Sequence, residues 1–364
     1  MSAHLFSPIQ LGTLDLPNRI AVAPMCQYSA DDGSATDWHV QHWMNLAMSG
    51  AGMVTIEMTD VERRGRISHG CLGLYSEANA AAAKRVLDAA KGVAAPGTKF
   101  GAQLAHAGRK ASCQWPWEGG QPLKASEDAW TVSASAIPFA EGHPIPQALD
   151  ESGIESLVEK FGKAADAAAQ VGFDFIELHS AHGYLLHQFL SPLSNQRKDQ
   201  WGGSLENRMR FPLAVARRVR AAAPSLMLGA RLSVKDWVAG GFDVEEAIKV
   251  AQAYKDAGVS YICCSSGGNS PLQQVPTGAG YQVHLATAIK EGTNIATRAV
   301  GMIDDPLHAN EIVSSGKADM VALARAFLVD PRWPWRAAAH LGQEIYAAPQ
   351  LSRAVPLMKQ WAAK

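Results

Sequence analysis

Short apolar runs alternate with longer amphipathic stretches along the chain. Apolar residues at helical spacing predict a helix over Ile154–Val171. Asp243 and Asp305-Pro306 are typical helix starts, and Gly258 and Gly316 are typical helix stops. Eight runs are apolar through most of their length, as expected of parallel strands buried on both faces: Ile20–Ala23, Met53–Glu57, Lys99–Leu104, Phe173–Leu178, Met227–Arg231, Tyr261–Cys264, Ala296–Gly301 and Met320–Leu323.

The alternation predicts an α/β fold. Strands followed by helices indicate βαβ units, and eight such units favour a closed (β/α)8 TIM barrel over an open doubly wound sheet. No GxGxxG motif follows the first strand, which argues against a dinucleotide-binding sheet. A barrel needs about 250 residues, so 364 residues leave roughly 110 for loops and tails. We expect one domain over residues 1–364.

One segment breaks the alternation. Residues 106–150 follow the third strand and are rich in Pro, Gly, Trp and Ser. Long irregular loops inside compact domains are usually functional, and this one would emerge at the catalytic face of a barrel. The sequence therefore predicts a lid insertion over about 109–150. The remaining surplus falls before Ile20, in a loop over Leu185–Arg210, and in a C-terminal tail over about 340–364.

Composition excludes several protein classes. The chain has 33 Lys and Arg against 34 Asp and Glu, which argues against a nucleic-acid binder. No apolar stretch approaches ~18 residues, so we expect no membrane span, and the N-terminus lacks a signal-peptide pattern. The five cysteines are odd in number and include no CxxC pair, which disfavours disulfides, zinc ribbons and iron–sulfur clusters. These features indicate a cytoplasmic protein.

The chemistry of a barrel lies at the carboxyl ends of its strands. After the fourth strand, His179, His182 and Tyr184 gather three hydrogen-bonding side chains in one short loop. Imidazoles can donate to a carbonyl oxygen, and a phenol can act as a general acid. The alternatives are a metal-binding pair or two surface histidines, although no HExxH-type signature accompanies them.

Small residues follow the last three strands. Glycines allow backbone N–H groups to approach a phosphate, and an arginine adds positive charge. Barrel phosphate sites commonly use the loops after strands 7 and 8. Ordinary turn glycines are the alternative, but the position in the barrel favours a phosphate site at Gly268, Gly301, Ala324 and Arg325.

Several longer motifs resemble the old yellow enzyme family, and within it the bacterial NADPH dehydrogenase, xenobiotic reductase and thermophilic-like ene-reductase subgroup. The likeness extends over nearly the whole chain and includes Cys26 and Tyr28. It is carried by Asn18–Ile20, Pro24–Tyr28, Gln103–Lys110, His179–Tyr184, Trp201–Arg208 and Asp330-Pro331. The resemblance implies an NADPH-dependent flavin oxidoreductase, an NADPH dehydrogenase or 2-enoate-type reductase, with FMN in a barrel.

The resemblance also implies roles for individual residues. Gln103 would bind the pyrimidine edge of the flavin, and Arg231 would place positive charge near its N1 atom, one of the few ways a protein tunes a flavin. Cys26 would tune its potential, although a buried apolar thiol is the commonest fate of a free cysteine. The remaining flavin contacts would come from Ala23, Pro24, Met25, Met58, Gly268, Gly301, Ala324 and Arg325.

On the substrate side, the resemblance implies reduction of electron-poor alkenes such as α,β-unsaturated carbonyls. His179 and His182 would hydrogen-bond the carbonyl oxygen, while the β-carbon receives hydride. Tyr184 would protonate the α-carbon, and Tyr28 would help to bind the substrate oxygen. Arg353 would reach the site of a neighbouring subunit in a homodimer or homotetramer, unless it is an ordinary surface arginine.

Three residues depart from the family pattern. Met58 stands where relatives carry a small residue, and Leu351 replaces an aromatic residue beside Arg353. Arg298 lies within the predicted seventh strand, where an unpaired charge would be costly. It must therefore reach the phosphate end or pair with a carboxylate, and the sequence leaves that choice open.

Two other functions remain open at this level. A barrel lyase or metal-dependent hydrolase would use His179 and His182 as metal ligands. A flavin-binding protein without catalytic activity would keep the cofactor contacts alone. The colour of the purified protein and its NADPH oxidation with cyclohexenone or maleimide separate these functions from an ene reductase.

Overall fold

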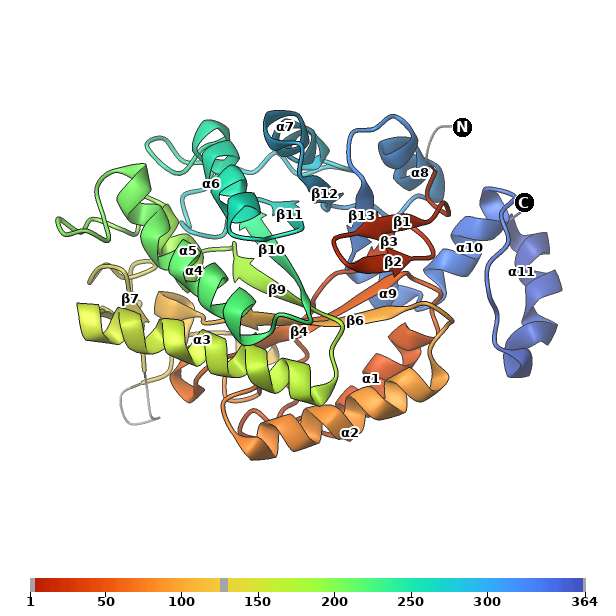
Figure 1. Ribbon diagram of the computed structural model, residues 1–364, viewed down its shortest axis with the longest axis horizontal. Helices are drawn as coiled ribbons and strands as arrows, with labels where there is room; N and C mark the ends of the chain where they lie inside the picture. Colours follow the sequence, from red (N-terminus) through yellow and green to blue (C-terminus); the bar gives the residue numbers. More distant parts are fainter. Residues whose placement is uncertain (1–3, 125–129, 363–364) are drawn as a thin grey trace.

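The computed structural model describes residues 4–124 and 130–362, and within them eight parallel strands close into a barrel (Figure 1). Pairing of β3 with β4 closes the ring. The (β/α)8 prediction is confirmed, although the seventh barrel strand ends at Ala299 rather than Gly301. The barrel strands are β3 (Ile20–Val22), β4 (Met53–Asp60), β6 (Lys99–Ala105), β9 (Phe175–Ser180), β10 (Met227–Ser233), β11 (Tyr261–Ser265), β12 (Ala296–Ala299) and β13 (Met320–Leu323).

Helices surround the barrel, and two of them begin at the predicted capping residues. The side chains of Asp243 and Asp305 each accept a hydrogen bond from the backbone N–H three residues later, so each caps a helix start, and Ser76 caps α2 in the same way. Gly258 and Gly316 follow helix ends with positive φ. The helices are α1 (Asp37–Ala47), α2 (Glu77–Val93), α3 (Glu151–Val171), α4 (Leu185–Leu190), α5 (Leu205–Ala222), α6 (Val244–Asp256), α7 (Val283–Thr293), α8 (Pro306–Ser314), α9 (Arg325–Val329), α10 (Trp333–His340) and α11 (Val355–Ala362).

An N-terminal hairpin closes one end of the barrel. Strands β1 (Ile9–Leu11) and β2 (Leu14–Leu16) pair antiparallel. Leu11 and Leu16 pack in one cluster with Met53, Phe175 and Met227, the first residues of β4, β9 and β10. The hairpin therefore plugs the amino ends of the strands, which leaves the carboxyl ends open for chemistry.

The segment between β6 and α3 contains only short elements: η2 (Gly108–Lys110), η3 (Pro116–Glu118), β7 (Val132–Ser133) and β8 (Gln147–Ala148). Residues 125–129 of the predicted lid lie outside the described residues. The guanidinium of Arg109 donates to the backbone oxygen of Ile137 at 3.3 Å and to that of Asn269 at 2.7 Å. This contact ties the insertion to the loop after β11, and its action as a lid stays a prediction.

One segment expected to be a loop is helical. The predicted loop over Leu185–Arg210 contains α4 and the start of α5, so that expectation was wrong. All six residues of α4 are buried, and a helix buried on every side shows no amphipathic stripe. The C-terminal tail forms η5 (Pro349–Ala354) and α11, which lies against α10 on the outside of the barrel (Figure 1).

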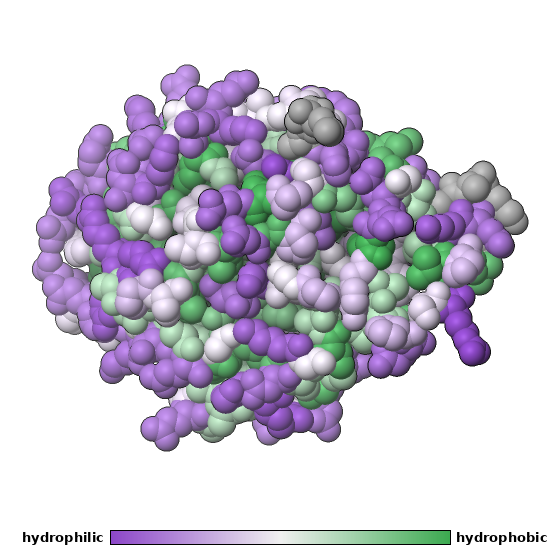
Figure 2. Space-filling view, turned by 45° about the vertical axis from the view of Figure 1, so that its right-hand side comes forward, coloured by the Kyte–Doolittle hydropathy of each residue, from purple (hydrophilic) through white to green (hydrophobic). Residues whose placement is uncertain are grey.

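Two short pieces near β4 complete the architecture, η1 (Arg63–Gly65) and β5 (Leu72–Gly73), which pairs with the end of β4. One face of the surface is mostly polar with scattered apolar side chains (Figure 2), as is ordinary for globular proteins. In the described part of the chain, no helix combines the length and apolar character needed to cross a bilayer.

Candidate active site

Two adjoining cavities open among the carboxyl ends of the barrel strands. The smaller encloses about 300 Å³ and the larger about 830 Å³. His182 and Arg231 line both, so the two cavities share a wall. Every residue that lines the smaller one was proposed from the sequence: Pro24, Met25, Cys26, Tyr28, Met58, Gln103, His179, His182, Tyr184 and Arg231.

The larger cavity holds the residues proposed for the phosphate end. Ala23 lies in its wall with the four residues that follow the last three strands, Gly268, Gly301, Ala324 and Arg325. The exception among the proposed residues is Arg353, which is exposed in η5 and lines neither cavity. A single chain does not test the predicted contact of Arg353 with a neighbouring subunit, which stays a prediction.

The loop after β9 brings three aromatic side chains together. The ring of His179 meets that of His182 edge to face with centroids 5.1 Å apart, and that of Tyr184 with centroids 4.9 Å apart. His182 and Gly183 both have positive φ, 60° and 72°. A Cβ atom on Gly183 would lie 2.2 Å from the carbonyl oxygen of Gly268. The loop can therefore make this turn only with glycine at position 183.

Position 268 requires glycine because of the same contact between the two loops. A Cβ atom on Gly268 would lie 2.5 Å from the Cα atom of His182. The close backbone contact between the loops after β9 and β11 thus requires glycine on both sides. Gly268 lines the larger cavity as predicted, but this packing already accounts for its lack of a side chain.

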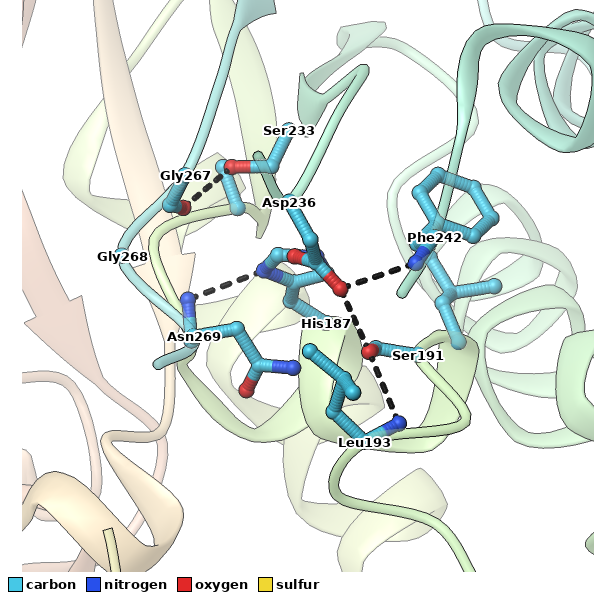
Figure 3. A network of polar contacts seen from close by, with 12 residues as sticks. His187, Ser191, Leu193, Ser233, Asp236, Phe242, Gly267, Gly268 and Asn269 are labelled. Carbon is cyan, nitrogen blue, oxygen red and sulfur yellow. Dashed lines mark hydrogen bonds and ion pairs between the residues drawn. The ribbon is translucent and has the colours of Figure 1, made fainter. Parts of the chain in front are cut away.

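A buried polar network around His187 and Asp236 holds the loop after β9 in place (Figure 3). The backbone N–H of Gly183 donates to Nδ1 of His187 at 2.9 Å, so this nitrogen carries no proton. The other ring nitrogen, Nε2, lies 3.1 Å from Oδ1 of Asp236, and both side chains are fully buried. Oδ2 of Asp236 accepts hydrogen bonds from the hydroxyl of Ser191 and the backbone of Phe242. The His187–Asp236 pair thereby fixes the backbone beside Tyr184.

Burial keeps the side chains of His179, His182 and Tyr184 uncharged. Burial, reinforced by the positive charge of Arg231, holds the pKa of His179 and of His182 well below the usual range. Burial likewise raises the pKa of the Tyr184 phenol well above 10. At neutral pH the cavity therefore offers two uncharged imidazoles and a protonated phenol, all hydrogen-bond donors.

Arg231 is a cation without a protein partner here. In the described part of the chain no hydrogen bond or ion pair involves its guanidinium, and its Nε atom is buried without a partner. Arg231 is half-buried, and leaving its buried Nε atom without an acceptor is costly, so the site suits an anionic or carbonyl-rich ligand. Cys26 and Met58 complete the wall, and burial raises the pKa of the Cys26 thiol, which stays protonated.

Sequence reasoning gave no role to two polar residues of this site. The hydroxyl of Ser265, at the end of β11, lies 2.7 Å from Nε2 of His182. The ammonium of Lys110 donates to the carbonyl oxygens of His182 and Gly268, both at 2.9 Å. Burial lowers the pKa of Lys110 to about 8. Ser265 is the last residue of β11, a position that marks candidate site residues in a barrel, whereas Lys110 lies in η2 beyond the end of β6 and carries no such signal.

Arg298 has a carboxylate partner and does not reach the phosphate end. Its guanidinium pairs with Glu177 inside the barrel, and both side chains are buried. No group of three or more metal-ligating side chains occurs among residues 4–124 and 130–362, so His179 and His182 lack a third ligand there.

The two cavities match the parts of FMN. A partner-free arginine and a glutamine amide line the smaller one, which suits the pyrimidine edge of a flavin. Arg325 lines the larger cavity together with Gly301, where a Cβ atom would lie 2.8 Å from Nε2 of Gln282. A cation beside a crowded backbone glycine suits the phosphate end.

Comparison with known proteins identifies the family of the chain. The model of the NADH:flavin oxidoreductase / NADH oxidase family matches residues 4–344. An NADPH dehydrogenase of Geobacillus sp. (strain WCH70) is 39% identical over 97% of this chain and 99% of its own.

Solved structures share the fold. Morphinone reductase superposes with a TM-score of 0.78 at 28% identity, over 96% of this chain and 93% of its own. A 2-naphthoyl-CoA reductase superposes at 0.83 over 93% of this chain, but at 24% identity and over only 52% of its own length it shows the fold alone. The chain therefore belongs to the NADH:flavin oxidoreductase / NADH oxidase family, as an NAD(P)H-dependent oxidoreductase with FMN as its cofactor.

Proposed function

We propose that this protein is an ene reductase, which uses NADPH to reduce the C=C bond of α,β-unsaturated carbonyls and related electron-poor alkenes. One observation carries the proposal: His179, His182 and Tyr184 line the same 300 Å³ cavity as the flavin-edge residues Gln103 and Arg231. Bound FMN supplies the hydride relay from NADPH to the β-carbon of the alkene. Both substrates use one site, so we expect ping-pong kinetics.

The two histidines bind the substrate carbonyl. Burial keeps both imidazoles neutral. A neutral imidazole still donates a hydrogen bond through its N–H group, and it does not favour a carboxylate over a carbonyl oxygen as a charged imidazolium would. Negative charge develops on the carbonyl oxygen as the β-carbon receives hydride, and donors fixed around that oxygen stabilise it. Ser265, which hydrogen-bonds Nε2 of His182, orients this ring.

Tyr184 delivers the proton to the α-carbon. Its phenol stays protonated because burial raises its pKa, and its ring packs edge to face on His179, which fixes its direction. Tyr28 lies in the same wall and helps to bind the substrate oxygen. It adopts a positive φ of 51°, an unusual backbone conformation for a bulky residue that is typical of functional positions.

The assembly and the compartment form part of the proposal. Arg353 is exposed on η5 and lines neither of the two cavities, which supports insertion into the site of a neighbouring subunit in a homodimer or homotetramer. All five cysteines are free, which supports a reducing, cytoplasmic location. Light scattering of the wild-type protein and of Arg353→Ala, together with activity, tests the subunit contact.

The test of the function is anaerobic NADPH oxidation with an alkene panel. The purified protein should be yellow and release FMN on denaturation. Cyclohexenone or maleimide should accelerate NADPH oxidation, and His179→Ala/His182→Ala should abolish that acceleration while the cofactor stays bound. A colourless protein with stoichiometric zinc, or a yellow one that no alkene stimulates, would contradict the proposal.

A further inference from the structure

A carboxylate lies at the centre of the barrel and accepts hydrogen bonds from three sides. Oε1 of Glu177, on β9, accepts from the side-chain amide of Gln103 at 2.8 Å. Oε2 accepts from the hydroxyl of Tyr261 at 2.8 Å and from the guanidinium of Arg298. All four side chains are at most 1% exposed. Such a group is held rigidly, because breaking any one contact would leave a buried charge poorly satisfied.

Arg298 balances the charge of this carboxylate. It approaches from β12, three strands away around the barrel from Glu177 on β9. Its guanidinium carbon lies 4.9 Å from the ring centroid of Tyr261, and a second nitrogen donates to the hydroxyl of Thr55 at 3.3 Å. The pair therefore buries equal and opposite charges beneath the cavities, with no net charge.

The network decides which atom Gln103 offers to the cavity. Its amide nitrogen donates to Glu177, and no hydrogen bond to its Oε1 occurs within the described part of the chain. Rotating the amide by half a turn would place Oε1 against the carboxylate, where two acceptors repel each other. Gln103 also lines the smaller cavity. It therefore presents a carbonyl acceptor there, and the pyrimidine edge of FMN carries one imide N–H donor.

We propose that Arg298 and Glu177 are positioning residues for the cofactor, which act through Gln103. The ion pair fixes the Gln103 amide so that its oxygen accepts from the imide N–H of FMN. Arg298 also cancels a negative charge that would otherwise lie next to the pyrimidine ring. This proposal rests on the cofactor part of the proposed function and is independent of the alkene substrate.

The competing account is that the pair only stabilises the barrel. Loss of a purely structural ion pair would lower the unfolding temperature and leave a cofactor still bound normally. Loss of a positioning pair would change the affinity for FMN, its visible spectrum and its midpoint potential. Arg208 provides a matched control, because it is also a buried arginine paired with a glutamate, Glu246, but lies on α5 away from both cavities.

The experiment compares Arg298→Met, Arg298→Lys, Glu177→Gln/Arg298→Met and Arg208→Met as holoenzymes. The dissociation constant comes from the fluorescence of FMN released on serial dilution, with thermal unfolding and the midpoint potential measured on the same samples. We expect Arg298→Met to weaken FMN binding roughly tenfold or more and to make its potential more negative, since Glu177 would be left as a buried carboxylate without a counter-charge. Arg208→Met should lower the unfolding temperature alone.

If Arg298→Met fails to fold, Arg298→Lys and Glu177→Gln/Arg298→Met distinguish a positioning role from a purely structural one. Arg298→Lys keeps the positive charge and should retain most of the affinity and the potential. Glu177→Gln/Arg298→Met removes both charges and should recover the potential towards that of the wild type. Unchanged FMN affinity and potential in Arg298→Met, a loss of both in Arg298→Lys although that variant keeps the positive charge, or equal losses in Arg208→Met would overturn the proposal. Alkene reduction by the wild-type protein tests the proposed function separately.

Discussion

The phenol ring of Tyr184 packs edge to face on the imidazole of His179, with the ring centroids 4.9 Å apart. The two residues are five positions apart, one at the end of β9 and the other just before α4. In the proposed mechanism, the contact orients Tyr184, the proposed proton donor, relative to His179, which is proposed to bind the substrate carbonyl. It therefore couples the two tasks that the alkene half-reaction requires.

Replacing Tyr184 with phenylalanine keeps this ring contact and removes only the hydroxyl. We expect alkene reduction to slow by about 10²-fold or more, the usual contribution of a general acid, while NADPH still reduces the cofactor at the wild-type rate. Stopped-flow absorbance separates the two half-reactions. Equal losses in both would show that Tyr184 is not the proton donor.

Gly183 should tolerate no side chain. Gly183→Ala would place Cβ 2.2 Å from the carbonyl oxygen of Gly268 and disturb the loop that carries Tyr184. Gly203→Ala is the matched control, because Gly203 has a similarly positive φ of 84° and open space around its Cβ position. We expect the control to cost about 1–2 kcal/mol through backbone strain alone. Gly183→Ala should cost more and reduce kcat, and identical behaviour of the two variants would contradict the packing argument.

The neutral histidines predict a distinct pH dependence. Burial and Arg231 lower the pKa of His179 and His182 in the folded protein, whereas unfolded imidazoles titrate near about 6.5. Below that pH the unfolded state binds more protons, so the free energy of unfolding falls as the pH drops towards the lowered pKa values. The contribution is fully present above about 6.5.

We therefore expect the unfolding temperature to decline below about pH 6.5, and kcat/KM for the alkene to show no inflection there. His179→Asn/His182→Asn should flatten part of the decline. An activity profile with a clear inflection near about 6.5 would mean that a histidine of the site titrates normally.

Cys26 lines the smaller cavity, where we propose that the flavin ring binds. Its thiol stays protonated because burial raises its pKa. Replacement by serine substitutes a more polar hydroxyl for a polarisable thiol, and we expect a lower potential of the bound FMN and altered turnover. Cys113→Ser, at a thiol that lines neither cavity, should leave the potential unchanged. An unchanged potential in Cys26→Ser would remove its proposed tuning role.

The barrel and most of the site could be predicted from the sequence because both depend on local signals. Buried parallel strands leave continuous apolar runs, and polar residues gather where those runs end, which located His179. The roles of Gln103 and Arg231 came from the resemblance to the old yellow enzyme family. The partner of Arg298 could not be predicted in this way. Glu177 is 121 positions away, and only closure of the barrel brings the two together.

Other features were hidden for different physical reasons. Helix α4 is buried on all sides and therefore carries no amphipathic stripe. Ser265 is an ordinary residue at a strand end until the fold places it against His182. The requirement for glycine at position 268 comes from a contact with the loop after β9, and such a contact has no local sequence signal.

The stoichiometry of the anaerobic reaction tests the central claim most directly. Purified holoenzyme would be mixed with NADPH and 2-cyclohexenone without oxygen, and cyclohexanone would be quantified against the NADPH consumed. An FMN-dependent ene reductase forms one saturated ketone for each NADPH oxidised. NADPH consumption without cyclohexanone, or none at all without oxygen, would contradict the assignment of this site to alkene reduction.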